Sequence, residues 1–112
     1  MNADKHRFKT KGLRPKRLPA VHPGRALKMI LSDAKLSANE VALALRIPAN
    51  RLTETINGKR SISADTAMRL GRYFGTWAEM WMNMQSHYDL EVAEVALAER
   101  IDSEVQPYRK SA

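Results

Sequence analysis

The sequence contains no cysteine, which excludes disulfide bonds, thiolate metal ligands and a cysteine nucleophile. It also lacks a run of about 18 apolar residues, the length that a membrane-spanning helix needs. Its first nineteen residues have no apolar stretch of the kind found in a signal peptide. We therefore expect a cytoplasmic protein that is neither exported nor embedded in a membrane.

Patterns for metal binding and catalysis are missing as well. The three histidines, His6, His22 and His87, lie too far apart to supply ligands with local spacing, and no carboxylate cluster joins them. No residue context marks a nucleophile, and a small helical bundle offers little volume for a substrate pocket. We expect no metal, no cofactor, no small-molecule substrate and no enzymatic activity.

The apolar residues that are present, 44% of a 112-residue chain, suffice for one compact domain with tails. Charge is distributed unevenly along this chain. Residues 1–19 hold seven Lys and Arg and one Asp, whereas residues 76–106 hold one Arg and seven Asp and Glu. The basic N-terminal residues suit binding to a polyanion, and the acidic C-terminal residues suit binding to a basic partner. Both segments can also be surfaces that contact only solvent.

Signals for helix starts and stops divide the chain from residue 22 onward. Pro23 suits the first position of a helix, where its missing N–H is no loss. Ser37 and Glu40 have the spacing of a capping box, which predicts the start of a second helix. That helix ends near Arg46, because Pro48 disfavours helical geometry in the residue before it.

Further signals predict a third helix of ten residues, 48–57, and two or three helices after it. Gly58 ends the third helix by adopting left-handed geometry. Ser63 caps a fourth helix, which Gly75 terminates. Thr76 and Glu79 form a second capping-box pattern, and the acidic stretch beyond either continues this fifth helix or forms a sixth. The expected fold class is all-α, a five- or six-helix bundle.

The domain boundaries follow from these signals and from the charge distribution. The predicted parts are a flexible basic N-terminal arm (1–21), a helix-turn-helix core (22–75), a C-terminal helical segment for dimerisation or partner binding (76–106) and a tail (107–112).

The second and third predicted helices, joined by a short turn, have the arrangement of a helix-turn-helix unit. With Leu52 and Ile56 turned inward, a polar set remains on the outer side of the third helix: Ala49, Asn50, Arg51, Thr53, Glu54 and Asn57. The major groove of B-DNA accepts one such helix, and these side chains are chemically suited to base edges. Arg51 matches guanine, either Asn matches adenine, Glu54 accepts from cytosine, and Thr53 offers a methyl group to thymine.

Contacts to phosphates are expected from a second set of residues: Ser37, Asn39, Lys59 and Arg60, together with the basic arm. The same geometry occurs in helical proteins that never bind nucleic acid, so the pattern by itself leaves both readings open. Glu54 favours the second reading unless it reads cytosine or orients Arg51, because an acid facing DNA weakens binding.

Apolar side chains after residue 76 form a stripe that suits either the core or a seam between subunits. The candidate interface residues for a dimer or another partner are Trp77, Met80, Trp81, Met84, Tyr88 and Leu90.

Several motifs then occur in the order typical of one family. They are His22-Pro23-Gly24, Asn57-Gly58-Lys59-Arg60, the segment 62–67, Arg69-Leu70, Phe74-Gly75-Thr76 and the stretch 81–88. On these motifs, residues 21–97 resemble the HigA antitoxins, a branch of the Cro/C1-type (XRE) helix-turn-helix family with a lambda-repressor-like fold.

This resemblance implies an antitoxin of a type II toxin-antitoxin system. Such a protein neutralises a HigB-like toxin, a RelE-like ribonuclease that cuts mRNA, and binds double-stranded operator DNA as a homodimer to repress its own operon. The alternative is a free-standing repressor of the XRE family without a toxin partner.

Three positions depart from the family pattern. Ala38 stands where many XRE proteins have a Gln that contacts a phosphate, and Arg25 stands where HigA proteins usually have an acid. Arg46 occupies a turn position where Gly is common. We therefore expect either that the turn forms without left-handed geometry or that Arg46 itself faces the DNA phosphates.

Overall fold

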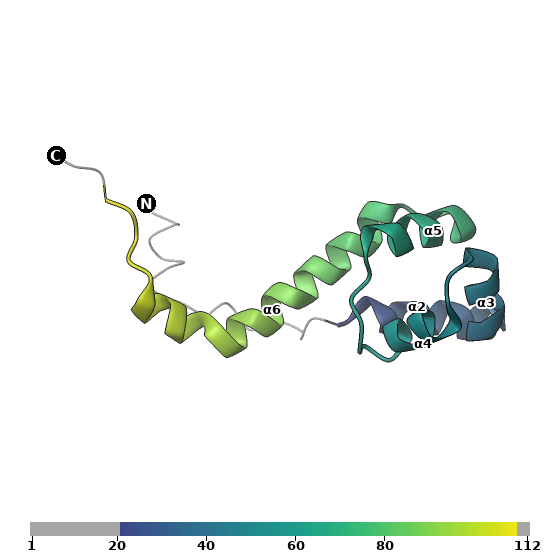
Figure 1. Ribbon diagram of the computed structural model, residues 1–112, viewed down its shortest axis with the longest axis horizontal. Helices are drawn as coiled ribbons and strands as arrows, with labels where there is room; N and C mark the ends of the chain where they lie inside the picture. The colour runs from purple at the N-terminus through teal and green to yellow at the C-terminus, as the bar shows by residue number, and fades with distance from the viewer. Residues whose placement is uncertain (1–20, 110–112) are drawn as a thin grey trace. The chain divides into compact units, whose positions relative to one another are not determined.

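The computed structural model describes residues 21–109, which form five α-helices and no strand (Figure 1). The helices are α2 (Pro23–Ala34), α3 (Ala38–Leu45), α4 (Ala49–Ile56), α5 (Ala64–Phe74) and α6 (Ala78–Glu104). The predicted all-α class is confirmed, and the acidic stretch continues the last helix instead of forming another. Except for Val21, the predicted N-terminal arm lies outside the described residues.

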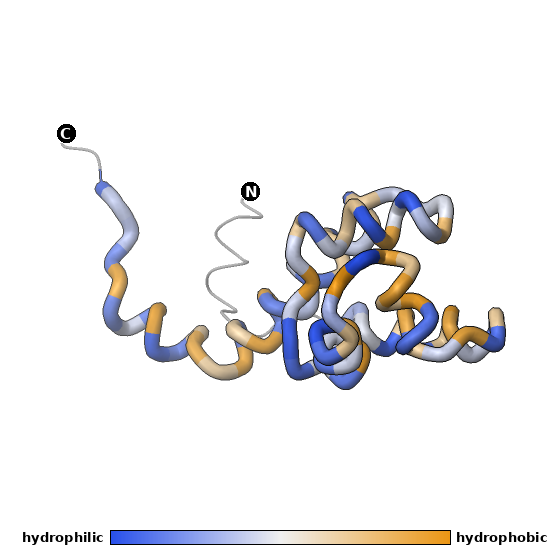
Figure 2. The backbone as a smooth tube through the Cα atoms, turned by 45° about the vertical axis from the view of Figure 1, so that its right-hand side comes forward, coloured by the Kyte–Doolittle hydropathy of each residue, from blue (hydrophilic) through white to orange (hydrophobic). Residues whose placement is uncertain are grey.

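The described residues belong to two compact units, one ending at Tyr88 and the other beginning at Asp89. In the first unit, α2 packs against α4, and α3 packs against both α4 and α5. Hydrophobic and hydrophilic residues alternate along each of these helices (Figure 2). The apolar ones form a single core, which includes Leu27, Val41, Leu52, Leu70 and Trp81, each fully buried.

Three of the predicted helix starts are confirmed by hydrogen bonds. His22 Nδ1 accepts from the backbone N–H of Gly24 at 2.9 Å, just before α2. The capping box of α3 is complete, because Ser37 Oγ accepts from the N–H of Glu40 at 3.0 Å and Glu40 Oε1 accepts from the N–H of Ser37 at 2.8 Å. Ser63 Oγ caps α5 by accepting from the N–H of Thr66 at 3.2 Å.

The predicted capping box at Thr76 and Glu79 is wrong. Helix α6 begins at Ala78, one residue too late for Thr76 to be its cap. The Thr76 hydroxyl accepts the indole Nε1–H of Trp81 at 2.9 Å, so it anchors the ring of a core residue. A contact in the tertiary structure, the bond to Trp81, therefore determines the role of Thr76, which local spacing had assigned to a helix cap.

Left-handed backbone geometry occurs at the predicted glycines, with φ of 76° at Gly58 and 73° at Gly75. It also occurs at Arg46, with φ 61° and ψ 45°. The expectation that this turn avoids left-handed geometry is therefore wrong. The backbone N–H of Arg46 remains bonded to the carbonyls of Ala42 and Leu43, which satisfies the end of α3 despite the steric cost of a Cβ atom at this φ.

Candidate nucleic-acid interface

Helix α4 is held in place mainly by its apolar side. Leu52 and Thr55 are buried almost completely, and the hydroxyl of Thr55 donates to the carbonyl of Arg51 at 2.9 Å, so no polar group of this side chain is left unsatisfied in the core. Because one side of α4 is committed to the core, its opposite side has a fixed orientation toward solvent.

Gly24 determines how closely α2 approaches the C-terminal end of α4. A Cβ atom at this position would lie 1.9 Å from the carbonyl oxygen of Thr55 and 2.9 Å from that of Ile56. Both neighbours are backbone atoms, which cannot move aside by a change of side-chain rotamer. The glycine of the His22-Pro23-Gly24 motif therefore seats α4 in the domain, a role that the spacing of the motif alone does not reveal.

The structure places all six predicted base-reading residues on the accessible side of α4 or just after it. Ala49, Asn50, Thr53 and Asn57 are exposed, and Arg51 and Glu54 are partly exposed. Thr53 donates its hydroxyl to the carbonyl of Ala49 at 3.0 Å. This bond occupies the hydroxyl within the helix and leaves the methyl group as the apolar part of the side chain.

Glu54 forms an ion pair with Arg60 in the segment after α4. Its Oε1 atom lies 2.8 Å from Arg60 Nη2 and accepts a hydrogen bond from Arg60 Nε at 2.9 Å. Both side chains are partly exposed. The carboxylate on the accessible side of α4 is thus balanced by a cation six residues later, and its partner is Arg60 rather than Arg51.

The predicted phosphate-contacting residues are likewise at the surface. Ser37 and Asn39 lie at the start of α3, Arg46 lies in the turn before α4, and Lys59 and Arg60 follow α4. The Ser37 hydroxyl is engaged in the capping box, whereas the two backbone segments that flank α4 present cations to solvent. A cationic border around a polar helix is an arrangement that fits the DNA backbone on either side of a groove.

Two contacts that sequence reasoning missed connect α6 to this region. The buried Gln85 accepts the backbone N–H of Ile62 at 2.8 Å through Oε1, which anchors the segment between α4 and α5. The ring of Tyr88 meets that of His22 edge to face, with centroids 5.1 Å apart. Gln85 and Tyr88 lie in the 81–88 stretch of the family motif, but neither the motif nor the apolar stripe that includes Tyr88 predicted these contacts.

The candidate interface residues of α6 differ in exposure. Trp77 is 78% exposed, Leu90 and Met80 are also exposed, and Met84 and Tyr88 are partly buried. Trp81 is 0% exposed, so its assignment to an intermolecular interface is wrong. Its ring fills the core of its own chain, where the bond to Thr76 satisfies its only polar atom.

Other kinds of site are not found among residues 21–109. No helix in this part of the chain is long and apolar enough to span a membrane. Within the same residues, no three metal-ligating side chains come together.

No family model matches the sequence. The structure is, however, similar to that of an addiction module antidote protein of the HigA family from Coxiella burnetii, with a TM-score of 0.75 and 44% identity, covering 81% of this chain and 100% of that one. The chain belongs to the HigA family of antitoxins. As a member of this family of antitoxins and helix-turn-helix regulators, it is not an enzyme.

A second HigA protein gives the comparison a DNA context. The Pseudomonas aeruginosa antitoxin HigA, solved with the higBA promoter, is 40% identical, with a TM-score of 0.75 over 79% of this chain and 97% of that one. Among curated proteins, Virulence-associated protein I of Dichelobacter nodosus is 47% identical over 78 residues, which is 69% of this chain and 72% of the relative. The similarity to the two HigA proteins therefore extends over 79–81% of this chain.

Proposed function

We propose that this chain binds the operator of its own operon through the outer side of α4 and neutralises a HigB-like toxin encoded beside it. The observation that carries the proposal is the two-sided character of α4. Leu52 and Thr55 bury one side, and the exposed side carries Asn50, Arg51 and Thr53, which match base edges. The Pseudomonas aeruginosa HigA, which was solved with the higBA promoter, supports operator binding by this chain.

The DNA-binding form is a homodimer in this proposal. A two-fold dimer presents two copies of α4 to successive major grooves on one face of the duplex, roughly 34 Å apart. The operator is accordingly an inverted repeat. Base choice comes from α4, and the flanking cations Arg46, Lys59 and Arg60 contribute affinity that is independent of sequence.

The toxin-binding role is supported by the other end of the chain. The exposed side chains of α6 beyond residue 90 alternate between acids and apolar groups, among them Val92, Val95 and Ile101. An acidic helix with exposed apolar side chains suits the surface of a basic protein, and toxins that cut mRNA need positive charge to hold their substrate. The segment 76–106 is therefore the part of the chain that we assign to partner binding.

Operator binding is tested by fluorescence anisotropy with three labelled probes: the duplex upstream of the gene, the same duplex with its inverted repeat scrambled, and a structured RNA of equal length. We expect preferential binding to the intact inverted repeat at about 0.15 M salt, the physiological ionic strength. Equal affinity for both duplexes, or preference for the RNA, would refute the DNA-binding role.

The toxin role is tested by coexpression. The neighbouring open reading frame is induced in cells with or without this chain, and growth is followed. Restored growth together with a copurifying complex is the expected result. A gene with no toxic neighbour, combined with retained operator binding, would instead identify a free-standing repressor.

A further inference from the structure

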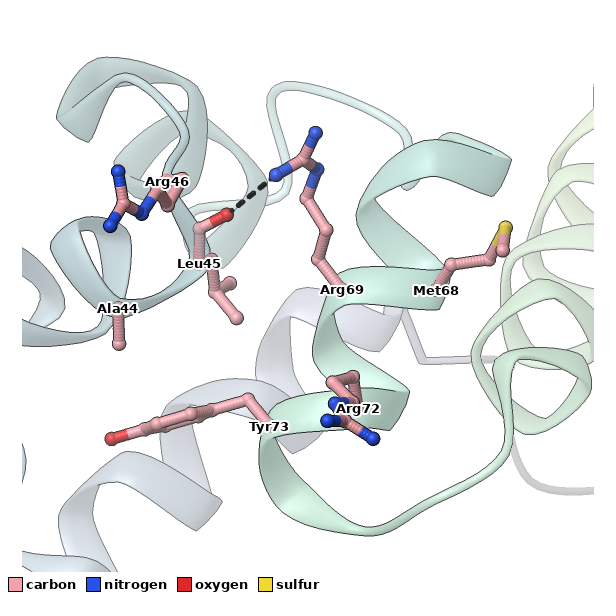
Figure 3. A pocket seen from close by; sticks show the side chains of 7 residues that line it. All are labelled: Ala44, Leu45, Arg46, Met68, Arg69, Arg72 and Tyr73. Carbon is pink, nitrogen blue, oxygen red and sulfur yellow. Dashed lines mark hydrogen bonds between the residues drawn. The ribbon is translucent and has the colours of Figure 1, made fainter.

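An open hollow of about 300 Å³ lies between the end of α3 and one side of α5 (Figure 3). The residues that shape it are Leu45 and Arg46 at the end of α3 and Met68, Arg69, Arg72 and Tyr73 on α5. This volume is at the lower limit of small-molecule sites, so it suits one large side chain better than an extended ligand. Nothing in the DNA-binding role uses this surface as a whole.

The hollow combines apolar surface with cations. Met68 is 67% exposed and Tyr73 is 43% exposed, so both side chains present apolar groups to solvent. Arg69 is already engaged, because its Nη1 atom donates to the carbonyl of Leu45 at 2.9 Å (Figure 3). Its Nε atom also pairs with Asp65. Arg72 is exposed and has no ion-pair partner among residues 21–109. The guanidinium of Arg72 is thus available to an incoming group.

A matching projection lies a few residues further along the same chain. Trp77, directly after the α5–α6 turn, is 78% exposed, in contrast to the fully buried Trp81. Glu79 is exposed and, like Arg72, has no ion-pair partner among residues 21–109. An exposed aromatic ring of this size can fill the hollow, and the unpaired acid beside it is complementary in charge to the arginines that line the hollow.

We propose that Trp77 of a second copy of this chain occupies the hollow, with Glu79 of that copy paired to Arg72. The indole covers Leu45, Met68 and Tyr73 and lies within reach of the arginine guanidinium groups, which favour the face of an aromatic ring. The inference rests on the homodimer of the proposed function and names the surface that forms it.

A second copy is favoured over other occupants because projection and hollow belong to the same chain. A two-fold interface uses one surface on both subunits, so each copy inserts its Trp77 and receives the Trp77 of the other. Opposite charges at Arg72 and Glu79 then occur twice, once in each half of the interface. A basic toxin surface would meet an unfavourable cation at Arg72.

The decisive experiment exchanges these charges. Sedimentation velocity is measured for Arg72→Glu, for Glu79→Arg and for their equimolar mixture. Each variant alone places like charges together twice, so we expect its dimer dissociation constant to rise about tenfold or more. In the mixed dimer one contact joins Arg72 to Glu79 as in the wild type and the other joins the two exchanged charges. Both contacts therefore unite opposite charges, so mixing restores the native dissociation constant.

The matched control Arg25→Glu, an exposed arginine on α2, leaves dimerisation unchanged.

A spectroscopic measurement reports on the ring itself. Acrylamide quenching of tryptophan fluorescence is followed from concentrations below to above the dissociation constant. Because Trp81 is already shielded, loss of quenching on dimerisation reports burial of Trp77, and Met68→Arg keeps the ring accessible at all concentrations. Quenching that does not change with concentration in the wild-type chain would overturn the inference.

These results remain separate from a test of the proposed function. If the mixture fails to recover or the single variants dimerise normally, the interface lies elsewhere, while specific operator binding by the wild-type chain still supports the repressor role. Absence of specific operator binding by the wild-type chain contradicts that role whatever the charge exchange shows.

Discussion

At the scale of the residue, Glu54 illustrates how a neighbour determines what a side chain can do. An isolated carboxylate on a recognition helix would repel the phosphates of DNA. Its ion pair with Arg60 offsets part of that repulsion and ties the segment after α4 to the helix. Because both partners are partly exposed, the pair contributes little to folding stability. Its value lies in the local electrostatics of the binding face.

Arg51 is the residue for which a base contact is easiest to test. Replacing it with Ala removes a bidentate donor for guanine, so operator binding should weaken by about 1–3 kcal/mol and one position of each half-site should lose its base preference. Anisotropy titrations against a panel of single-base operator variants measure both effects. Lys28→Ala, which removes a positive charge from the exposed side of α2, is the control and should preserve the preference. Unchanged affinity and preference in Arg51→Ala would contradict the groove assignment.

Gly24 gives a second prediction at this scale. In Gly24→Ala the new methyl group would meet two backbone carbonyls of α4, and relief of the overlap requires the helices to separate. We expect the free energy of unfolding to fall by about 1–3 kcal/mol. Urea denaturation followed by circular dichroism measures the change. Gly75→Asn is the matched control, since no atom lies within 4 Å of its Cβ position and Asn tolerates the left-handed φ. Equal stability of Gly24→Ala and the wild type would show that α2 and α4 can move apart freely.

At the scale of the element, α2, α3 and α5 begin where local capping predicts them, and the turn between α3 and α4 adopts a conformation that local preference disfavours. Arg46 adopts a conformation that favours glycine because α4 must begin at once and still bury Leu52. The adjacent Ile47 is also buried, so packing on both sides of the turn compensates for the backbone strain. A charged residue is thus retained in the turn that faces the proposed phosphate backbone.

The variant Arg46→Gly separates the strain from the charge. Left-handed geometry costs a non-glycine residue about 1–2 kcal/mol, and glycine adds about 0.5–1 kcal/mol of chain entropy to the unfolded state, so the variant should be more stable by up to about 1.5 kcal/mol. Operator affinity should nevertheless fall, with a shallower salt dependence, because the variant has no cation here to neutralise a phosphate. Thermal denaturation and salt titrations measure the two effects. Lys35→Gly, at the other left-handed non-glycine position, should change stability alone; unchanged operator binding in Arg46→Gly would place Arg46 away from the DNA.

At the scale of the whole molecule, charge of opposite sign is concentrated at the two ends of the sequence. The net charge of +7 hides a strongly basic start and an acidic end. Long-range electrostatics depends on such distributions more than on the total, since oppositely charged surfaces attract different macromolecules. In the proposed function, this charge distribution lets one short chain bind DNA at its basic end and a basic toxin at its acidic end.

Removal of residues 2–19 tests the basic end. The deletion takes away seven cations, so binding to the operator and to unrelated duplexes should weaken alike. The slope of log affinity against log salt should become shallower by about 0.9 for each phosphate that the shortened chain no longer neutralises. A chain whose first nineteen residues are scrambled at constant composition is the control and should bind as the wild type does. A selective loss of operator binding would instead indicate that this segment reads sequence.

Much of the fold and the candidate site was accessible from the sequence because helix signals are local. The caps at Ser37 and Ser63 and the stop at Gly75 involve atoms within about four residues of one another, so spacing alone predicted them. Placement of the polar face of α4 at the surface followed from the period of Leu52 and Ile56. The DNA-binding role itself stays a proposal that this geometry supports.

The sequence by itself determined the order of the helices, the composition of the exposed side of α4 and the motifs that mark the HigA family, because each depends on neighbours along the chain. Only the tertiary structure decided three features: the burial of Trp81 and not Trp77, the ion pair between Glu54 and Arg60, and the close packing of Gly24 against the backbone of Thr55. These features depend on atoms that folding brings together from separate elements. A pattern read along one helix carries no information about which of two similar rings will fill the space left by the others.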